Sequence, residues 1–147
     1  IAAFGGTDLL CYRVSTPEDL ALRQDQVWQP LLDWAEQRYS APLLVTREVA
    51  HVAQPEKTLA ALREAVATHD DFSLSAMHSL TAVLGSVVLS LAVSDGRIDP
   101  DTARSASLLD ELWQAEQWGD DDEAVVRREG IRAEVDFATR FLAVATS

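Results

Sequence analysis

The residues with the most chemical potential gather in one stretch, DELWQAEQWGDDDEAVVRREG, which covers residues 110–130. Seven acids lie between Arg104 and Arg127, and no Lys or Arg separates them. Trp113 and Trp118 lie among these acids. Carboxylates at this density can act as acid and base groups, bind a metal, face solvent on a helix, or form a surface that another protein recognises.

Acid–base catalysis is chemically possible at Glu111, Glu116 and residues 120–123. It needs an enclosed pocket that raises the pKa of one carboxyl group, whereas consecutive acids on a helix usually face water. The chain contains neither a GxSxG nucleophile motif nor a Gly-rich phosphate loop. Cys11 lies in the apolar context LLCYR, which is typical of a buried, unreactive thiol. The sequence therefore predicts a protein that is not an enzyme; the alternative is a small helical enzyme that uses carboxylates around Glu111 and Glu123.

Metal and cofactor sites find no support in the pattern of ligating residues. His51, His69 and His78 are scattered, and no CxxC pair occurs. The segment SDGRIDPD resembles half of a calcium-binding EF-hand loop. With Gly96 at the sixth position of such a loop, however, the first position is Leu91, which cannot bind calcium. We therefore predict neither a metal nor a cofactor.

The composition limits the class of partner. The chain has 147 residues, of which 48% are hydrophobic, which suits a single domain over residues 1–147. The net charge of −12 argues against nucleic acid and anionic membranes, because both are bound by clustered Lys and Arg. The longest apolar run, residues 80–93, is too short to span a bilayer, so we expect no membrane insertion. The single cysteine indicates a reducing compartment, and no targeting sequence is recognisable.

Helix signals dominate, and they predict a mainly α fold, a compact multi-helix domain of five to seven helices. Thr16 is the expected N-cap of a first helix, and Pro30 should break or kink it before a second helix to about residue 39. One short strand-like segment lies near 42–46. Further helices are expected over about 55–68, 74–94, 100–117 and 121–144. Asp99 with Pro100 should begin the helix 100–117, and Gly119 should end it.

Two of the expected helices carry further patterns. In the helix 74–94, Ala82, Ser86 and Ser90 lie four residues apart and predict a ridge of small side chains for close helix packing. In the helix 121–144, apolar residues recur along the chain and are the expected core positions. They are Val125, Ala133, Phe137, Phe141 and Val144.

Helical spacing divides the acidic stretch into two sides. Asp110, Gln114 and Trp118 share one side, and Glu111 lies beside them. The expected core side carries Leu108, Leu112 and Ala115. Because Trp118 ends the helix just before Gly119, its indole either packs under the turn or is presented to solvent. An exposed Trp among acids is typical of a protein-binding surface, where aromatic residues anchor the partner and charges steer it.

Four segments together resemble the family of ATP synthase assembly chaperones that bind the free alpha subunit. In chain order they are TDLLCYR, WQPLLDWAEQRYSAPLLVT, SLSAMHSLTAVLGSVVLSLAV and LDELWQAEQWGDDDEA. The resemblance extends from about Thr7 to about Leu142 and is carried by the order and spacing of the segments. It implies a chaperone without enzymatic activity that binds newly made alpha subunit and prevents its aggregation until the alpha and beta subunits form their ring.

The resemblance also implies a domain organisation and a site. The family has a β-rich N-terminal region, so this chain is expected to be the helical part of a larger α+β protein, with the β-rich region absent. By position around Trp-Gly, the implied partner-binding residues are Glu111, Gln114, Trp118, Asp122 and Glu123. Which acid after Trp118–Gly119 matches the family position stays open. We expect a protein that is monomeric when free and acts in the bacterial cytoplasm, with the mitochondrial matrix as the location of eukaryotic relatives.

Overall fold

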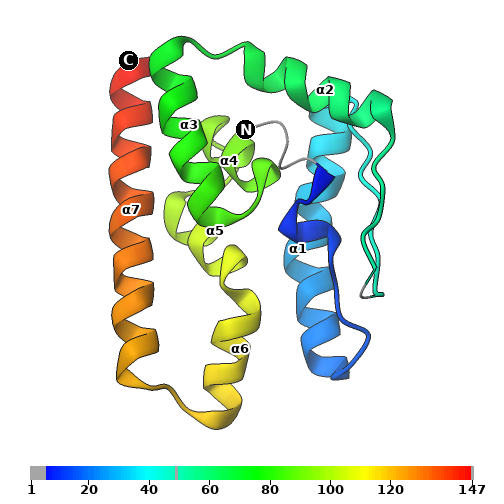
Figure 1. Cartoon of the computed structure of the whole chain (residues 1–147), viewed down its shortest axis with the longest axis vertical. Helices are drawn as coiled ribbons and strands as arrows, with labels where there is room; N and C mark the ends of the chain where they lie inside the picture. Colours follow the sequence, from blue (N-terminus) through cyan, green and yellow to red (C-terminus); the bar gives the residue numbers. More distant parts are fainter. Residues whose placement is uncertain (1–5, 49, 147) are drawn as a thin grey trace.

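Seven α-helices make up the part of the chain that the computed structural model describes, residues 6–48 and 50–146 (Figure 1). They are α1 (Glu18–Tyr39), α2 (Glu56–Ala67), α3 (Asp71–Leu84), α4 (Val87–Ser94), α5 (Pro100–Ser107), α6 (Leu109–Trp118) and α7 (Asp122–Thr146), preceded by the short 3-10 helix η2 (Leu9–Cys11). Within these residues the strand-like segment near 42–46 forms no strand and contributes one parallel bridge, between Tyr12 and Thr46. The predicted mainly α class with five to seven helices is confirmed.

The central helix of the domain is α4, which contacts α1, α3 and α5. Figure 1 shows α1 on one side of this group and α7 on the other, where α7 packs along α3 and α5. All seven residues from Val87 to Val93 are buried. Contact with helices on several sides explains why the sequence of α4 is apolar all round.

The apolar run expected to form one helix over 74–94 forms two helices instead. Gly85 ends α3 with φ 71°, a left-handed conformation that favours glycine. Ser86 then begins α4, and its Oγ accepts a hydrogen bond from the Leu89 N–H at 3.1 Å. A glycine C-cap followed directly by a serine N-cap is therefore the local reason for the break.

The expected ridge of small side chains does not form, because this break separates Ala82 from Ser86 and Ser90. Ala82 is exposed, whereas both serines are buried. Ser86 Oγ donates to Asp8 Oδ1 at 2.7 Å, and the Val88 N–H donates to Asp8 Oδ2 at 3.0 Å. Burial raises the pKa of the Asp8 carboxyl, and these hydrogen bonds oppose the shift. Ser86 thus connects the segment before η2 to the start of α4.

Helix α1 continues through Pro30, where the sequence predicts a break. A proline in a helix interior removes one backbone hydrogen bond and costs about 3 kcal/mol. Both halves of α1 bury apolar side chains, such as Trp28 before the proline and Leu31 after it, while Pro30 itself is exposed. Their shared packing offsets the cost of the proline. The N-cap residue is Pro17, which makes no side-chain cap, so the prediction of Thr16 as the N-cap was wrong.

Leu108 divides the helix expected over 100–117 into α5 and α6. Its φ of −100° and ψ of 15° interrupt the helix, although no Gly or Pro marks the position. Just before it, the Ala106 carbonyl accepts a hydrogen bond from Trp28 Nε1–H at 2.9 Å, so a contact with α1 lies at the end of α5. The outer ends of the pair are as predicted, since Asp99 caps α5 through its side chain and Gly119 ends α6.

Helix α7 buries a different side from the one predicted. The buried residues are Arg128, Val135, Ala138 and Leu142. The expected core positions are exposed, with exposed fractions of 42% at Val125, 72% at Phe137, 39% at Phe141 and 75% at Val144, and Ala133 is exposed as well. Both sets of residues recur at helical spacing. The periodicity therefore predicted the helix correctly but could not decide which of its two apolar sides packs against α3 and α5.

Candidate partner-binding site

The candidate site lies where α6 turns into α7, at the lower end of the molecule in Figure 1. Gly119 ends α6 with φ 88°, a value that residues with a side chain rarely adopt. Asp121 Oδ1 then accepts a hydrogen bond from the Ala124 N–H at 2.7 Å and caps the first turn of α7. Together these two residues turn the chain so that α7 starts beside α6.

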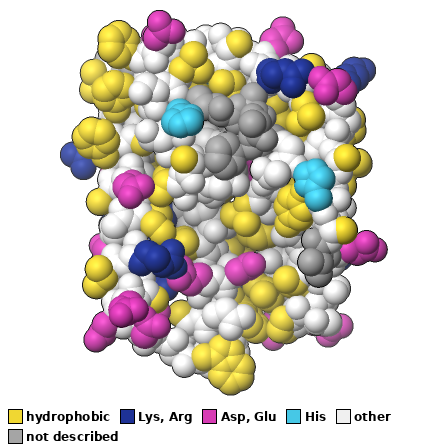
Figure 2. Space-filling model, viewed as in Figure 1, with side chains coloured by type: hydrophobic (Ala, Val, Ile, Leu, Met, Phe, Trp, Pro, Cys, Tyr) yellow, Lys and Arg dark blue, Asp and Glu magenta, His cyan; other side chains and the backbone are white. Residues whose placement is uncertain are grey.

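Four of the five predicted site residues are exposed at this turn. Trp118 has an exposed fraction of 81%, so its indole is presented to solvent and does not pack under the turn. Gln114, Asp122 and Glu123 are also exposed. Figure 2 shows a hydrophobic side chain protruding at this end of the molecule, with acidic side chains over the start of α7. An exposed indole beside carboxylates is suited to bind an apolar residue flanked by Lys or Arg, through burial, ion pairs and cation–π contacts.

The fifth residue, Glu111, is engaged within the protein. Its side chain is 29% exposed and forms ion pairs with Arg127 and, at 3.6 Å, with Arg128. Arg128 is largely buried and also pairs with Asp120 in the turn. Glu111 Oε2 is buried and accepts no hydrogen bond from any described residue. These contacts hold the start of α7 against α6, so Glu111 positions the turn that carries Trp118.

Two further acids of the stretch are engaged with α1. Glu116 Oε2 accepts from Arg23 Nη1 at 2.7 Å, and Asp110 Oδ1 accepts from Gln24 Nε2 at 2.7 Å. Arg23 and Gln24 lie far from these acids along the chain, so no local sequence pattern predicted them as partners. In the part of the chain that the structure describes, Asp122 and Glu123 make no ion pair. They are therefore the acids of this site that remain available to a partner.

The buried side of α6 also differs from the prediction. Leu109 and Trp113 are buried, whereas the expected core residues Leu108, Leu112 and Ala115 are only half-buried. The break at Leu108 starts a new helix, which buries the side of Leu109 and Trp113. Trp118 lies five residues after Trp113, about 140° around the helix, and is therefore outside the core.

A depression of about 230 Å³ lies between the two helices at the turn. Its lining includes Glu111, Gln114, Trp118, Asp120 and Arg128. Glu123 does not line it, so the two carboxylates of the alternative enzyme hypothesis do not share this hollow. Among the described residues, no group of three His, Cys, Asp or Glu side chains is placed to bind a metal ion. No helix in that part of the chain has the length and apolar character needed to cross a membrane.

Comparison with solved structures relates the chain to known proteins, although no family model matches it. The crystal structure of Atp12 from Paracoccus denitrificans superimposes with a TM-score of 0.94 and 43% sequence identity, covering 98% of this chain and 62% of that one. A point mutant of the same Paracoccus protein gives a TM-score of 0.95 and 42% identity over the same shares. A putative chaperone from Agrobacterium tumefaciens gives 0.91 and 35%, covering 99% of this chain and 55% of that one.

The chain thus spans less than two thirds of the length of the proteins that it matches, 62% and 55%. Within that span the fold is shared almost completely, and the sequence identity to the Paracoccus protein reaches 43%. The resemblance predicted from the four sequence segments is confirmed. Over nearly its whole length the chain is thus similar, in fold and in sequence, to Atp12 from Paracoccus denitrificans and to a putative chaperone from Agrobacterium tumefaciens.

Proposed function

We propose that this chain binds the unassembled alpha subunit of ATP synthase and shields the surface through which that subunit contacts its neighbour in the ring. The observation that carries the proposal is the 81% exposed indole of Trp118, held among acids on a chain related to Atp12. An unassembled ring subunit exposes an apolar interface, and such a patch is an aggregation hazard until a partner covers it. We propose that the protein does this without catalysis, in the bacterial cytoplasm.

The chemistry of the turn suggests how each residue contributes. Trp118 anchors the partner by burying its indole on binding, and Gln114 offers hydrogen bonds beside it. Asp122 and Glu123 attract a basic edge of the alpha subunit. Salt weakens this attraction, because the Debye length is about 8–10 Å at physiological ionic strength. Glu111 acts indirectly, because its ion pairs with Arg127 and Arg128 hold the turn in place.

The test is co-expression of the alpha subunit with this chain, followed by measurement of soluble alpha subunit and co-elution on a sizing column. The variants are Trp118→Ala and the double variant Asp122→Lys/Glu123→Lys. The matched control is Glu36→Lys/Glu64→Lys, which makes the same charge change at two exposed acids on α1 and α2. Glu111→Lys is a poor probe, since it would place a third cation beside Arg127 and Arg128.

We expect the wild type and the control to keep the alpha subunit soluble, and both turn variants to lose it while circular dichroism shows them folded. Binding by the wild type should weaken as salt is raised, and the double variant should remove much of that salt dependence. If the folded turn variants perform as well as the wild type, the site lies elsewhere on the chain. If the wild type fails to bind the alpha subunit, the proposed function fails for this chain.

The enzyme alternative gains no support from the geometry. Glu111 is already engaged by Arg127 and Arg128, and Glu123 faces solvent. General acid–base catalysis needs two carboxyl groups in a shared, enclosed environment that separates their pKa values. A member of this structural group from Agrobacterium tumefaciens is a putative chaperone.

A further inference from the structure

A second apolar surface runs along the outer side of α7. Six residues define this outer stripe: Val126, Gly130, Ala133, Phe137, Phe141 and Val144. They follow one another at intervals of four, three, four, four and three residues, which places them on one side of a helix. Val126, Phe137 and Val144 have exposed fractions of 71%, 72% and 75%. The stripe is distinct from the buried side of α7, which packs on α3 and α5.

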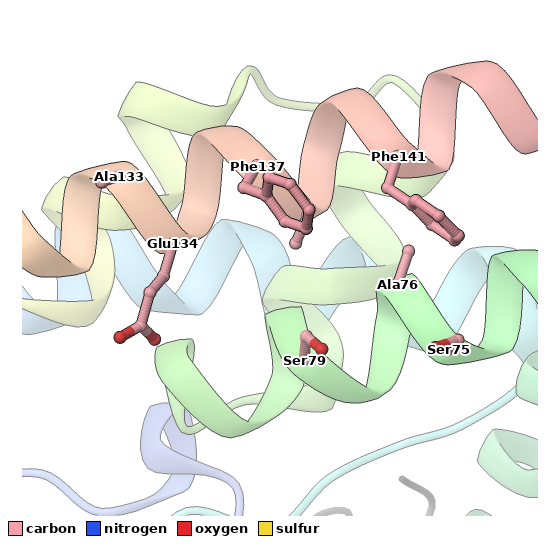
Figure 3. Close-up of a pocket in the computed structure, with 8 residues that line it drawn as sticks. Ser75, Ala76, Ser79, Ala133, Glu134, Phe137 and Phe141 are labelled. Carbon is pink, nitrogen blue, oxygen red and sulfur yellow. The ribbon is translucent and has the colours of Figure 1, made fainter.

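A groove between α7 and α3 widens this apolar surface. Its volume is about 430 Å³, and small residues of α3, Ser75, Ala76 and Ser79, line one wall. Phe137 and Phe141 of α7 line the groove from its other side (Figure 3). Phe72 of α3 is 69% exposed, and its ring centroid lies 6.5 Å from that of Phe141. The aromatic rings and the small residues together form a ridge beside a recess, a shape that can accept side chains from another helix.

The length of the stripe indicates the kind of element that fits it. From Val126 to Val144 a helix rises about 27 Å, at about 1.5 Å per residue, or roughly five turns. Large apolar side chains are exposed at the two ends of the stripe, with the small residues Gly130 and Ala133 between them. Several large apolar side chains exposed on one side of a helix mark an interaction site. A long straight stripe beside a groove matches the helix-in-groove mode of recognition, in which the partner helix presents apolar residues at three- and four-residue intervals.

The charges beside the stripe select the partner. Seven charged residues of α7 lie three or four positions from a stripe residue: Asp122, Glu123, Arg127, Glu129, Glu134, Asp136 and Arg140. Five are acids, and Arg127 already pairs with Glu111. The whole chain has a net charge of −12. A second copy of the chain would bring a further −12 and mostly acidic flanks to the contact, whereas a basic helix would meet opposite charge along both sides.

We propose that the outer stripe docks an amphipathic helix of a protein partner that carries Lys and Arg beside its apolar residues. The proposal follows from the surface of α7 and α3 and does not depend on the identity of the alpha subunit as the partner of the Trp118 turn. Phe137 and Phe141 are the apolar anchors, and Glu129 and Glu134 set the charge preference. This surface adds a helix-binding site to the turn between α6 and α7.

The test uses two designed helical peptides of about five turns. Both carry the same Leu residues at alternating intervals of three and four, and they differ only in their flanks, which are Lys and Arg in one peptide and Glu in the other. Binding to the 147-residue chain is followed by fluorescence anisotropy of the labelled peptide. We expect the basic peptide to bind at least about tenfold more tightly than the acidic one at low salt, and the gap to narrow as salt is added.

Two variants make the test specific. Phe137→Ser should weaken binding of the basic peptide about tenfold or more, because a buried phenylalanine contributes at least that factor. Its control is Leu44→Ser, at an apolar residue that is 49% exposed outside α7. Glu129→Lys/Glu134→Lys should shift the preference towards the acidic peptide, whereas the same charge change in Glu36→Lys/Glu64→Lys should not. This reversal does not depend on Phe137→Ser remaining folded.

Several results would overturn the proposal. The proposal fails if neither peptide binds the wild type. It also fails if the α7 variants change peptide binding no more than their control variants do. A dimer of the chain in analytical ultracentrifugation that Phe137→Ser dissociates would show that a second copy covers the stripe. Binding by this chain but not by a longer natural protein that contains it would show that another segment of the same protein covers it.

Discussion

Replacing the two tryptophans of α6 one at a time separates packing from recognition. Trp113 is 7% exposed and Trp118 is 81% exposed, although they lie five residues apart in one short helix. Removing a buried indole costs the lost transfer free energy and leaves a cavity, so Trp113→Ala should lower the free energy of unfolding by about 3–5 kcal/mol. Because Trp118 has most of its surface in water already, Trp118→Ala should change that free energy by no more than about 0.5 kcal/mol.

Urea denaturation followed by far-ultraviolet circular dichroism at pH 7 measures both losses on one scale. Fluorescence quenching gives an independent check of where the indole of Trp118 lies. The carboxylates near Trp118 should attract the cationic quencher caesium and repel the anionic quencher iodide. Trp118→Ala should therefore reduce quenching of the tryptophan fluorescence by caesium more than quenching by iodide. In the co-expression assay, Trp118→Ala should lose the alpha subunit while keeping its stability.

A loss of more than about 2 kcal/mol in Trp118→Ala would refute this reasoning, since a side chain exposed in the free protein cannot contribute that much to folding. The indole would then pack in solution, and any loss of alpha-subunit binding would follow from unfolding. A Trp113→Ala variant as stable as the wild type would refute the assignment of the buried side of α6.

Two substitutions and one labelling experiment test other parts of the fold. Hydrogen bonds from Arg47, together with the charges of Arg47 and Arg13, lower the pKa of the Asp25 carboxyl. The ion pairs of Asp25 therefore stabilise the fold above about pH 4, and this stabilisation is lost as the pH falls through the lowered pKa. Asp25→Asn should therefore cost about 1 kcal/mol at pH 7, a value limited by solvent screening, and urea denaturation should show the gap to wild type narrowing below about pH 4. Burial raises the pKa of the Cys11 thiol to about 12. A thiol reagent at pH 8 should therefore label Cys11 only as the chain unfolds, and rapid labelling without urea would contradict its burial. Gly119→Ala should lower the free energy of unfolding by about 1–3 kcal/mol because alanine is strained at φ 88°, and a neutral result in urea denaturation would show that the turn has a different conformation.

Much of the secondary structure follows from interactions within a few residues, and the sequence was sufficient to predict it. Asp99 and Gly119 mark the start of α5 and the end of α6 as expected, since a cap depends on one side chain or one backbone angle. Gly96, after the end of α4, adopts a left-handed conformation with φ 77°, which glycine favours. Gly85 and Ser86 are likewise a helix C-cap and a helix N-cap, and they mark the break between α3 and α4. This break was not predicted, because Ser86 was assigned to a ridge of small side chains.

The candidate site was predictable in its residues but not in their roles. The sequence placed Trp118 at the end of a helix, yet whether its indole packs or protrudes depends on which side of α6 is buried, and that is the side of Leu109 and Trp113. Glu111 was expected to face a partner, and its ion pairs with Arg127 and Arg128 connect two helices. Contacts of this kind join residues distant in the chain, so no local pattern contains them.

The sequence by itself determined the family resemblance, the helical class and most helix ends, because these depend on composition, residue order and local hydrogen bonds. Only the tertiary structure decided that α1 passes through Pro30 and which side of α7 is buried. At Pro30, packing on both sides of the proline outweighs a local cost of about 3 kcal/mol. On α7, Val135 and Phe137 belong to two apolar stripes with the same helical spacing, and only the neighbouring helices α3 and α5 choose between them. The same choice leaves Phe137 exposed for a partner.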